Sequence, residues 1–138
     1  MTVLLDTNIL LDYLQKRPEF SNAEMILDIC ADKKIFGYMA AHSIPDMYYI
    51  MRKTYSDEER RSILLNLINV VPVISVDQKR IVSALSNKNF LDFEDCLQTE
   101  CASSFSADYI ATRNINDFSQ SSVPPVSPQD FLNLIANQ

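Results

Sequence analysis

The chain has 138 residues, of which 47% are hydrophobic and 22% are charged, and its formal net charge is −6. This length and composition fit a single globular domain over residues 1–138 that can bury a core of its own. The acidic balance disfavours a simple nucleic-acid-binding module, because affinity for a phosphate backbone normally comes from lysine and arginine. It is compatible with an enzyme whose acidic residues surround divalent cations, since such ions reverse the local field.

The scarcity of glycine and histidine disfavours further classes of protein. Gly37 is the only glycine, whereas phosphate-binding loops need several. His42 is the only histidine, which argues against a histidine-based zinc site or a Ser-His-Asp triad. Cys30, Cys96 and Cys101 are odd in number and form no C-x-x-C pair, so we expect reduced core thiols. Neither a signal peptide nor a membrane-spanning run is visible, and we expect a cytoplasmic protein without a membrane partner.

Apolar periodicity predicts strands that alternate with amphipathic helices along the chain. We expect Met25 to lie on the buried stripe of its helix, Ser43 to cap the next helix, and Pro18 to end the first one. In chain order the predicted elements are a strand at 2–5, a helix from 9 towards 18, a helix at 21–33, a strand at 35–39, helices at 43–53 and 56–68, a strand at 70–76, helices at 77–85 and 92–104, a strand at 107–111, an edge strand at 126 and a helix at 128–136. This order predicts an α/β fold: a three-layer α/β/α sandwich around a mostly parallel sheet of four to five strands.

Aspartates stand where the predicted strands finish, the edge at which open parallel sheets bind ligands. Asp6 ends the first strand, Asp46 is in the first turn of the helix after the second strand, and Asp117 follows the fourth strand. Asp95 joins them only if its helix begins at the same edge. Mg²⁺ and Mn²⁺ prefer oxygen ligands, lower the pKa of bound water and stabilise charge on a phosphate. We therefore predict that these four aspartates bind Mg²⁺ or Mn²⁺, with Asp6, Asp95 and Asp117 as the catalytic set.

Three of these aspartates also have structural interpretations. Asp46 follows Ser43 at the spacing of a capping box. Asp117 has the character of a turn residue. Asp95 stands near a helix start, where the helix dipole favours acidic side chains. Asp6 is the hardest to explain in this way, because a carboxylate at the end of a buried strand is costly unless it is paired or metal-bound.

Other polar residues near these positions have weaker signals. Asp92 is the best N-cap candidate of its helix, and Glu94 is placed where the dipole favours an acid. Short polar groups beside the acids either orient carboxylates or cap helices, and basic residues either contact an RNA backbone or are simply solvated. The first group is Asn8, Thr112 and Asn114, and the second is Arg113, Lys16 and Arg52.

Three segments, taken in order, resemble the motifs of the PIN-domain family. They are Asp6-Thr7-Asn8 within L-L-D-T-N-I-L-L-D, then Asp92-Phe93-Glu94-Asp95 followed by C-L-Q-T-E-C-A, and residues 107–114 continued to Asp117-Phe118. The resemblance covers nearly the whole chain. It implies a parallel sheet flanked by helices, binding of Mg²⁺ or Mn²⁺, and cleavage of single-stranded RNA. Small members of the family, the VapC-like toxins, pair with an antitoxin protein and form homodimers.

The resemblance also assigns individual residues. Asp6, Asp95 and Asp117 match the family's metal-binding acids. A fourth acid is usually a glutamate within a helix, and here Asp46 stands in that place with a side chain one methylene shorter. Asp92 and Glu94 are supporting acids in this scheme, and Asn8 and Thr112 are hydrogen-bond partners of the ligands.

The leading hypothesis is thus a metal-dependent endoribonuclease, an enzyme that is the toxin of a toxin–antitoxin pair. The first alternative is a catalytically silent PIN-like module that binds RNA or protein. The second is an aspartyl-phosphate phosphotransfer enzyme. A dehalogenase-like member of that class would need an aspartate where Asn8 stands, and a receiver-like member would need a lysine after the last strand, whereas the last lysine is Lys88.

Overall fold

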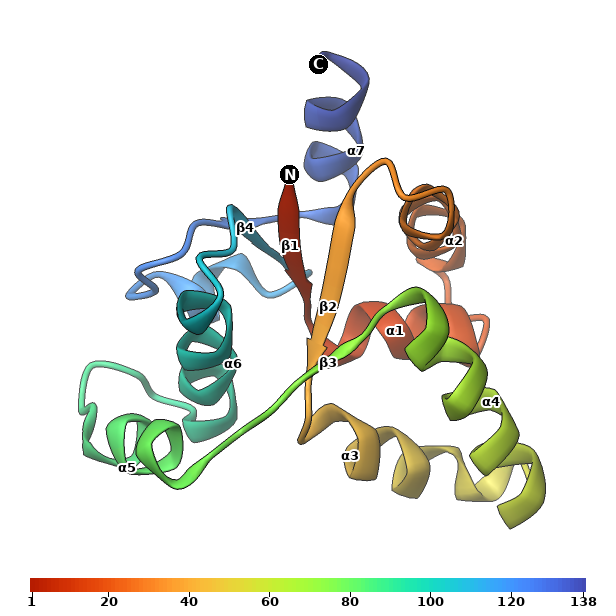
Figure 1. The fold of residues 1–138 in the computed structure, drawn as a ribbon, viewed down its shortest axis with the longest axis horizontal. Helices are drawn as coiled ribbons and strands as arrows, with labels where there is room; N and C mark the ends of the chain where they lie inside the picture. Colours follow the sequence, from red (N-terminus) through yellow and green to blue (C-terminus); the bar gives the residue numbers. More distant parts are fainter.

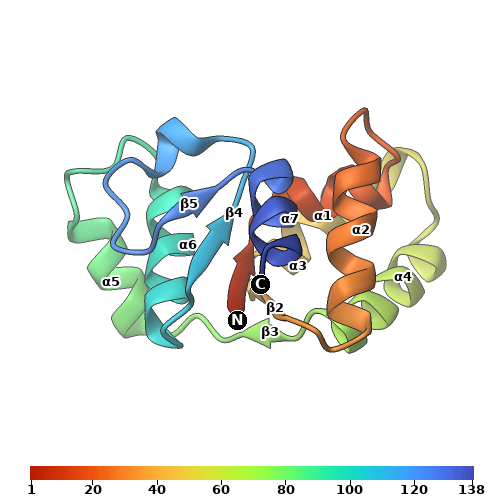
Figure 2. The same ribbon diagram turned by 90° about the horizontal axis from the view of Figure 1, so that it is seen from above.

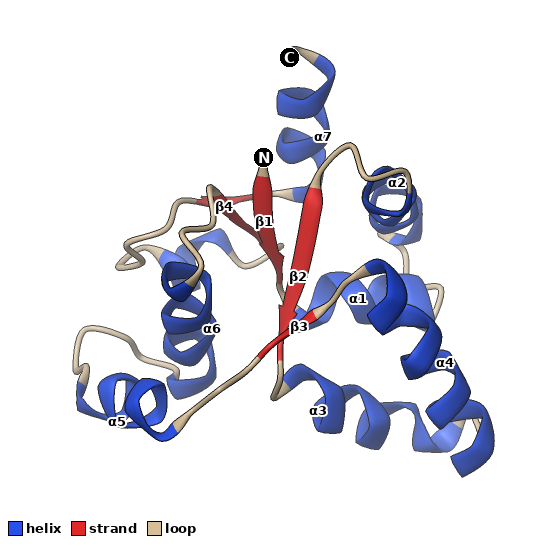
Figure 3. Ribbon diagram, viewed as in Figure 1, coloured by secondary structure: helices blue, strands red, loops and turns tan.

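A five-stranded, all-parallel sheet with the order β3-β2-β1-β4-β5 forms the centre of the computed structural model, which describes all 138 residues. The strands are β1 (Thr2–Leu5), β2 (Phe36–Ala40), β3 (Val73–Ile74), β4 (Tyr109–Ala111) and β5 (Pro125–Val126). Figure 3 shows them in red between the helices. The predicted parallel sheet is confirmed.

Helices cover both faces of this sheet, so the predicted three-layer α/β/α architecture is also confirmed. The helices are α1 (Thr7–Leu14), α2 (Phe20–Ala31), α3 (Ser43–Ile50), α4 (Asp57–Val70), α5 (Gln78–Ser86), α6 (Phe93–Ser104) and α7 (Pro128–Ala136), with 3-10 turns η1 (Met51–Lys53) and η2 (Ile115–Phe118). Helices α5 and α6 lie on one side, and α1, α2, α3, α4 and α7 lie on the other (Figures 1 and 2). None of these helices combines the length and apolar character needed to cross a bilayer.

Helices cover both faces of strand β1, and its successive side chains point to opposite faces, so both sets of side chains are buried. Val3 and Leu5 join the large core formed with α1, α2, α4 and α7. Leu4 points the other way and packs with Ile110 and Phe118 in a second core beneath α6. The strand therefore anchors both layers, which fixes the position of the residue that follows it. The three cysteines are buried and unpaired, as expected.

Two details of the first two helices differ from the prediction. Met25 is 52% exposed, because the buried face of α2 is formed by Ala23, Ile26 and Leu27. A residue directly before Ile26 is rotated by about 100° away from that face. Helix α1 ends at Leu14 rather than continuing towards Pro18, since the chain turns at Lys16 through a positive φ of 50°.

Strand β3 and the start of α3 also depart from expectation. This edge strand has only two residues, because α4 continues through Val70 and Pro72 has no N–H with which to extend the pairing with β2. Ser43 does not cap α3. His42 occupies the N-cap position without a side-chain capping bond, and the Ser43 hydroxyl is buried and bonded to Thr7 instead. The capping-box interpretation of Asp46 was therefore wrong.

Candidate metal centre

The candidate site lies where the direction of the chain reverses within the sheet. Strand β1 pairs with β2 on one side and with β4 on the other, so the connections leave the β1–β4 pair in opposite directions. Crevices at such switch points, outside the carboxyl ends of the strands, are the usual ligand sites of open parallel sheets. Asp6 follows β1 there, and Thr112 follows β4. The strands run towards the starts of α1 and α3 (Figure 1).

Asp6 is buried and is held by the neighbouring strand. Its N–H donates to the Ala111 carbonyl at 3.0 Å, and its Oδ2 accepts a hydrogen bond from the Thr112 hydroxyl at 2.8 Å. Although Asp6 occupies the N-cap position of α1, its side chain makes no capping bond. The carboxylate therefore points into the crevice rather than serving the helix.

A pocket of about 440 Å³ brings the predicted acids together. All four predicted ligands line it, as do the supporting acids, so six carboxylates share one pocket whose lining contains no basic side chain. Its lining residues are Asp6, Thr7, Asn8, Leu11, Asp46, Tyr49, Ile50, Asp92, Glu94, Asp95, Asn114 and Asp117. Helix α6 thus begins at this edge, which is the condition on which the inclusion of Asp95 depended. Thr112 is not part of this lining, but it is buried and its hydroxyl donates to Asp6.

The first turn of α6 presents two of these acids. Asp92 caps the helix, as its sequence position predicted, by accepting a hydrogen bond from the Asp95 N–H at 3.0 Å. The Asp95 carbonyl in turn accepts a hydrogen bond from the Thr99 hydroxyl at 3.1 Å. These bonds fix the backbone from which the side chains of Glu94 and Asp95 project.

A buried polar cluster adjoins the pocket through Thr7, which belongs to its lining. The hydroxyl oxygens of Thr7 and Ser43 are 2.7 Å apart, and Gln98 Nε2 donates to them at 3.1 Å and 3.4 Å. Sequence reasoning missed Gln98. A signal was available, because Gln98 is four residues after Glu94 and three after Asp95 and therefore shares their face of α6. The Oε1 of Gln98 is buried without a hydrogen-bond partner.

Crowding of the acids changes their proton affinity. Burial, and then the nearby carboxylates of Asp92, Asp6 and Asp117, raise the pKa of Asp95 to about 7. Burial and the adjacent Asp46 raise the pKa of Glu94 to about 7. Burial also raises the pKa of Asp6, against the opposing effect of the Thr112 hydroxyl. Negative charge at this edge is thus incompletely compensated by the protein, as expected where a cation binds.

The donor chemistry fits a hard divalent cation. The side chains available are carboxylate and amide oxygens, which are the ligands that Mg²⁺ and Mn²⁺ prefer. No three acidic or histidine side chains form a ready-made coordination sphere in this structure. Such a sphere is not needed, because Mg²⁺ usually takes one or two direct carboxylates and retains several waters. Asp6, Asp95, Asp117 and Asp46 are the residues that would hold it.

His42 lies beside the acids but outside the pocket lining. Its Nε2 is 4.0 Å from Glu94 Oε1, and neither ring nitrogen has a hydrogen-bond partner. Burial lowers the pKa of His42, and the nearby Asp46 partly opposes this effect. A neutral imidazole is therefore favoured, so His42 contributes little positive charge to the site.

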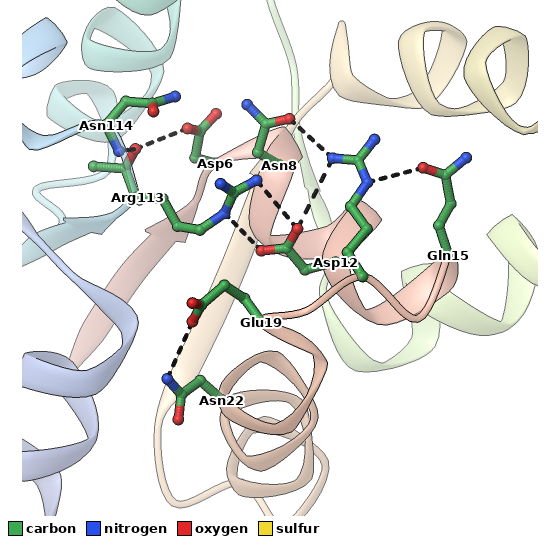
Figure 4. Close-up of polar contacts among 10 residues, drawn as sticks. Asp6, Asn8, Asp12, Gln15, Glu19, Asn22, Arg113 and Asn114 are labelled. Atoms are coloured by element: carbon green, nitrogen blue, oxygen red, sulfur yellow. Dashed lines mark hydrogen bonds and ion pairs between the residues drawn. The ribbon is translucent and has the colours of Figure 1, made fainter.

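Asp12 is a second residue that sequence reasoning missed. This α1 residue is buried, and its carboxylate accepts two hydrogen bonds from Arg113, at 2.8 Å and 3.2 Å (Figure 4). Arg113 is therefore ion-paired rather than simply solvated. A carboxylate and a guanidinium separated by 101 positions give no local sequence signal, which explains why the pair was not foreseen.

The other basic residues suggested as RNA contacts are in different places. Arg52 stacks its guanidinium on the ring of Tyr49, 3.7 Å from the centroid, and Tyr49 lines the acidic pocket. Lys16 instead lines an apolar pocket between α1, α2 and α4. The structure thus brings Arg52 and Arg113 near the acids and leaves Lys16 apart from them.

A parallel sheet with clustered carboxylates at its switch point defines an α/β protein whose site has the donors of a divalent-cation centre. Residues 2–116 match the family model of the PIN domain, and the chain belongs to that family. A comparison with curated proteins gives no match.

Several solved structures share this fold. VapBC from Salmonella typhimurium, bound to DNA, matches with a TM-score of 0.70 and 15% identity over 93% of this chain and 98% of that one. The toxin–antitoxin complex from Klebsiella pneumoniae matches with a TM-score of 0.66 and 22% identity, over 91% of this chain and 97% of that one. FitAcB from Neisseria gonorrhoeae matches with a TM-score of 0.67 and 17% identity, over 92% of this chain and 98% of that one. At these identities the likeness establishes the fold.

Proposed function

We propose that this PIN-domain protein is a metal-dependent endoribonuclease that cleaves phosphodiester bonds of single-stranded RNA. The observation that carries this proposal is the gathering of six carboxylates, without a basic side chain, around one pocket at the β1–β4 switch point. Asp6, Asp95 and Asp117 are the catalytic metal ligands in this proposal, and Asp46 is the fourth acid. The PIN-domain match over residues 2–116, a range that includes Asp6, Asp46 and Asp95, supports the same assignment.

The protein's own contribution is to hold and orient these acids. A divalent cation, when bound, supplies a water of lowered pKa and stabilises negative charge on the scissile phosphate. Thr112 fixes the rotamer of Asp6, and Asp92 fixes the turn that carries Asp95. Asn8 and Asn114 offer neutral polar groups at the pocket wall, where they can donate hydrogen bonds to phosphate oxygens.

The biological role in this proposal is that of a VapC-like toxin in the cytoplasm, a homodimer that an antitoxin protein inhibits. Support comes from the solved structures with the same fold, which include VapBC and toxin–antitoxin complexes. Co-expression with the protein encoded by the neighbouring reading frame, followed by co-purification, tests this role. A toxin should arrest growth when it is expressed alone and should lose that effect when its partner is present.

The nuclease proposal is tested with end-labelled, unstructured RNA and purified protein in Mn²⁺, Mg²⁺ or EDTA. We expect cleavage in both metals, none in EDTA, and none by a folded Asp6→Asn variant. Asp32→Asn is the matched control, because Asp32 is exposed between α2 and β2, at the opposite edge of the sheet. Loss of activity in the control as well would show that the effect is not specific to the pocket.

The silent-module alternative makes a different prediction. A PIN-like module that no longer cleaves RNA and has lost its metal site should not gain thermal stability from Mn²⁺, whereas binding to the native state must raise stability. Absence of both cleavage and metal binding would favour that alternative.

A further inference from the structure

One buried carboxylate organises two arginines beside the acidic pocket. Asp12 is 1% exposed, and a charge in such a position is stable only when it is paired and hydrogen-bonded. Arg113 donates to both of its oxygens through Nε and Nη2, at 2.8 Å and 3.2 Å. Arg17 Nη1 lies 3.9 Å from Asp12 Oδ1. One carboxylate with two guanidinium groups leaves this cluster with a net positive charge.

Both arginines border the pocket. Arg113 lies in the chain between Thr112, whose hydroxyl bonds Asp6, and Asn114, which lines the pocket. Arg17 Nη1 donates to Asn8 Oδ1 at 3.4 Å, and Asn8 lines the pocket too. Figure 4 shows Asp12 beneath the Arg113 guanidinium, with Asp6 and Asn8 close by. The positive cluster therefore adjoins the place where the protein concentrates negative charge.

These contacts hold the two guanidinium groups in place and leave some of their N–H donors without a partner. The side chains of Arg17 and Arg113 are 31% and 36% exposed. The bidentate contact to Asp12 uses Nε and Nη2 of Arg113, so Nη1 is free to donate elsewhere. A planar, fixed guanidinium with spare donors suits a phosphate oxygen better than a mobile surface lysine does.

We infer that Arg113 and Arg17 form a subsite for an RNA phosphate next to the bond that is cleaved, and that Asp12 is the positioning residue of this subsite. The inference rests on the proposed function, because it takes RNA as the substrate. It also explains how a chain with a net charge of −6 can hold a polyanion close to a carboxylate cluster.

A charge effect and a positioning effect predict opposite changes in the RNA affinity of Asp12→Asn, so the experiment distinguishes between them. Removing the Asp12 charge makes the rim of the pocket more positive, so a charge effect alone would tighten RNA binding. If Asp12 acts by holding the arginines, Asp12→Asn should weaken RNA binding although it removes a negative charge. A cluster that only stabilises the fold would change the free energy of unfolding and leave the RNA affinity of the folded protein unaltered.

The experiment measures fluorescence anisotropy of a short, labelled, single-stranded RNA in Ca²⁺ buffer at several salt concentrations. The variants are Arg113→Gln, Arg17→Gln, Asp12→Asn and the Asp12→Asn/Arg113→Gln double variant, each checked for cooperative thermal unfolding. Lys34→Gln is the charge-matched control, since Lys34 is exposed at the opposite edge of the sheet. KM and kcat for RNA cleavage in Mn²⁺ are measured in parallel.

We expect each arginine variant to bind RNA about tenfold more weakly. Each should also reduce the slope of log affinity against log salt by about 0.7, the value for one phosphate contact on a single strand. Asp12→Asn should weaken binding in the same direction, and its effect should be smaller once Arg113 is replaced, because only Arg17 then remains for Asp12 to hold. The change should appear in KM more than in kcat.

Arginine variants that bind RNA as Lys34→Gln does would overturn the inference, and so would tighter binding by folded Asp12→Asn. If Asp12→Asn fails to fold, the arginine variants still decide whether the subsite exists. The binding assay does not require cleavage. A protein that binds RNA through these arginines but never cleaves it would contradict the nuclease proposal and leave this subsite intact.

Discussion

The hydroxyl oxygens of Thr7, which lines the acidic pocket, and Ser43 share a buried hydrogen bond of 2.7 Å. This contact joins α1 to α3, and Gln98 extends it to α6. The three helices that carry or follow the pocket acids are therefore tied together through the first residues of α1 and α3 and the second turn of α6. Because the acids repel one another, a rigid polar support of this kind is required to hold them at one edge.

Loss of this support should destabilise the fold. Thr7→Val keeps the shape of the side chain but leaves the Ser43 hydroxyl and Gln98 amide of the buried cluster poorly paired, which costs about 1–3 kcal/mol. Urea unfolding measures the change. Thr54→Val is the control, because Thr54 is exposed and makes no side-chain hydrogen bond in this structure, so its stability should stay near that of the wild type. Equal stability of the Thr7 and Thr54 variants would contradict the account.

The single glycine should be intolerant of even a methyl group. A Cβ atom at Gly37 would lie 2.6 Å from Cys30 Sγ, which is a severe overlap in the buried core between β2 and α2. We expect Gly37→Ala to destabilise the protein by about 1–3 kcal/mol, the usual cost of overpacking. Thermal unfolding of the Cys30→Ala/Gly37→Ala double variant checks the cause: relief of the overlap predicts a coupling between the two substitutions, and strictly additive effects would exclude it.

Stability of the metal-free protein should depend on pH through the pocket acids. The pKa of Asp95 is about 7 in the folded chain, against an ordinary value of 3.8. The folded state therefore binds this proton more tightly than the unfolded state does. Its contribution to stability is present below about pH 3.8 and is lost as the pH rises towards about 7. Burial and its neighbours act on Glu94 in the same direction.

We accordingly expect the unfolding temperature in EDTA to fall between about pH 5 and about pH 7, and to fall less steeply for Asp95→Asn. Differential scanning calorimetry across this range makes the comparison. Asp32→Asn, at an exposed position away from the pocket, should retain the wild-type slope. An Asp95→Asn protein with an unchanged slope would show that this carboxyl does not titrate as the structure indicates.

Divalent cations should stabilise the wild type and should stabilise the pocket variants much less. Binding to the native state alone adds about 2.7 kcal/mol when the metal concentration is about a hundred times its Kd. A thermal-shift titration with Mn²⁺ should therefore raise the unfolding temperature of the wild type and of Asp32→Asn. Asp6→Asn and Asp95→Asn should show a smaller rise. The same rise in all four proteins would place the bound metal elsewhere.

The order of strands and helices could be predicted because apolar periodicity records it locally. Buried stretches such as Thr2–Leu5 and amphipathic helices such as α2 need no knowledge of distant contacts. The placement of Asp6 at the sheet edge followed from the same pattern. Short β3 could not be bounded in this way, since the end of α4 and the start of the strand are both apolar around Val70.

The contacts that organise the site were harder to predict because they join distant parts of the chain. Asp12 looks like an ordinary polar residue of α1 until Arg113 is seen across from it. Ser43 was misassigned because a helix cap and a buried hydrogen bond use the same hydroxyl, and only the proximity of Thr7 decides between them. The family motifs indicate which acids gather, but not the polar groups that hold them.

The metal-dependent nuclease assignment is decided by the rate of cleavage of end-labelled RNA as a function of Mn²⁺ concentration, for the wild type and for Asp6→Asn. The wild-type rate should rise to saturation with Mn²⁺ and vanish in EDTA, and folded Asp6→Asn should show no metal-dependent rise. Cleavage that persists in EDTA, or a folded Asp6→Asn protein with the wild-type rate, would contradict that assignment.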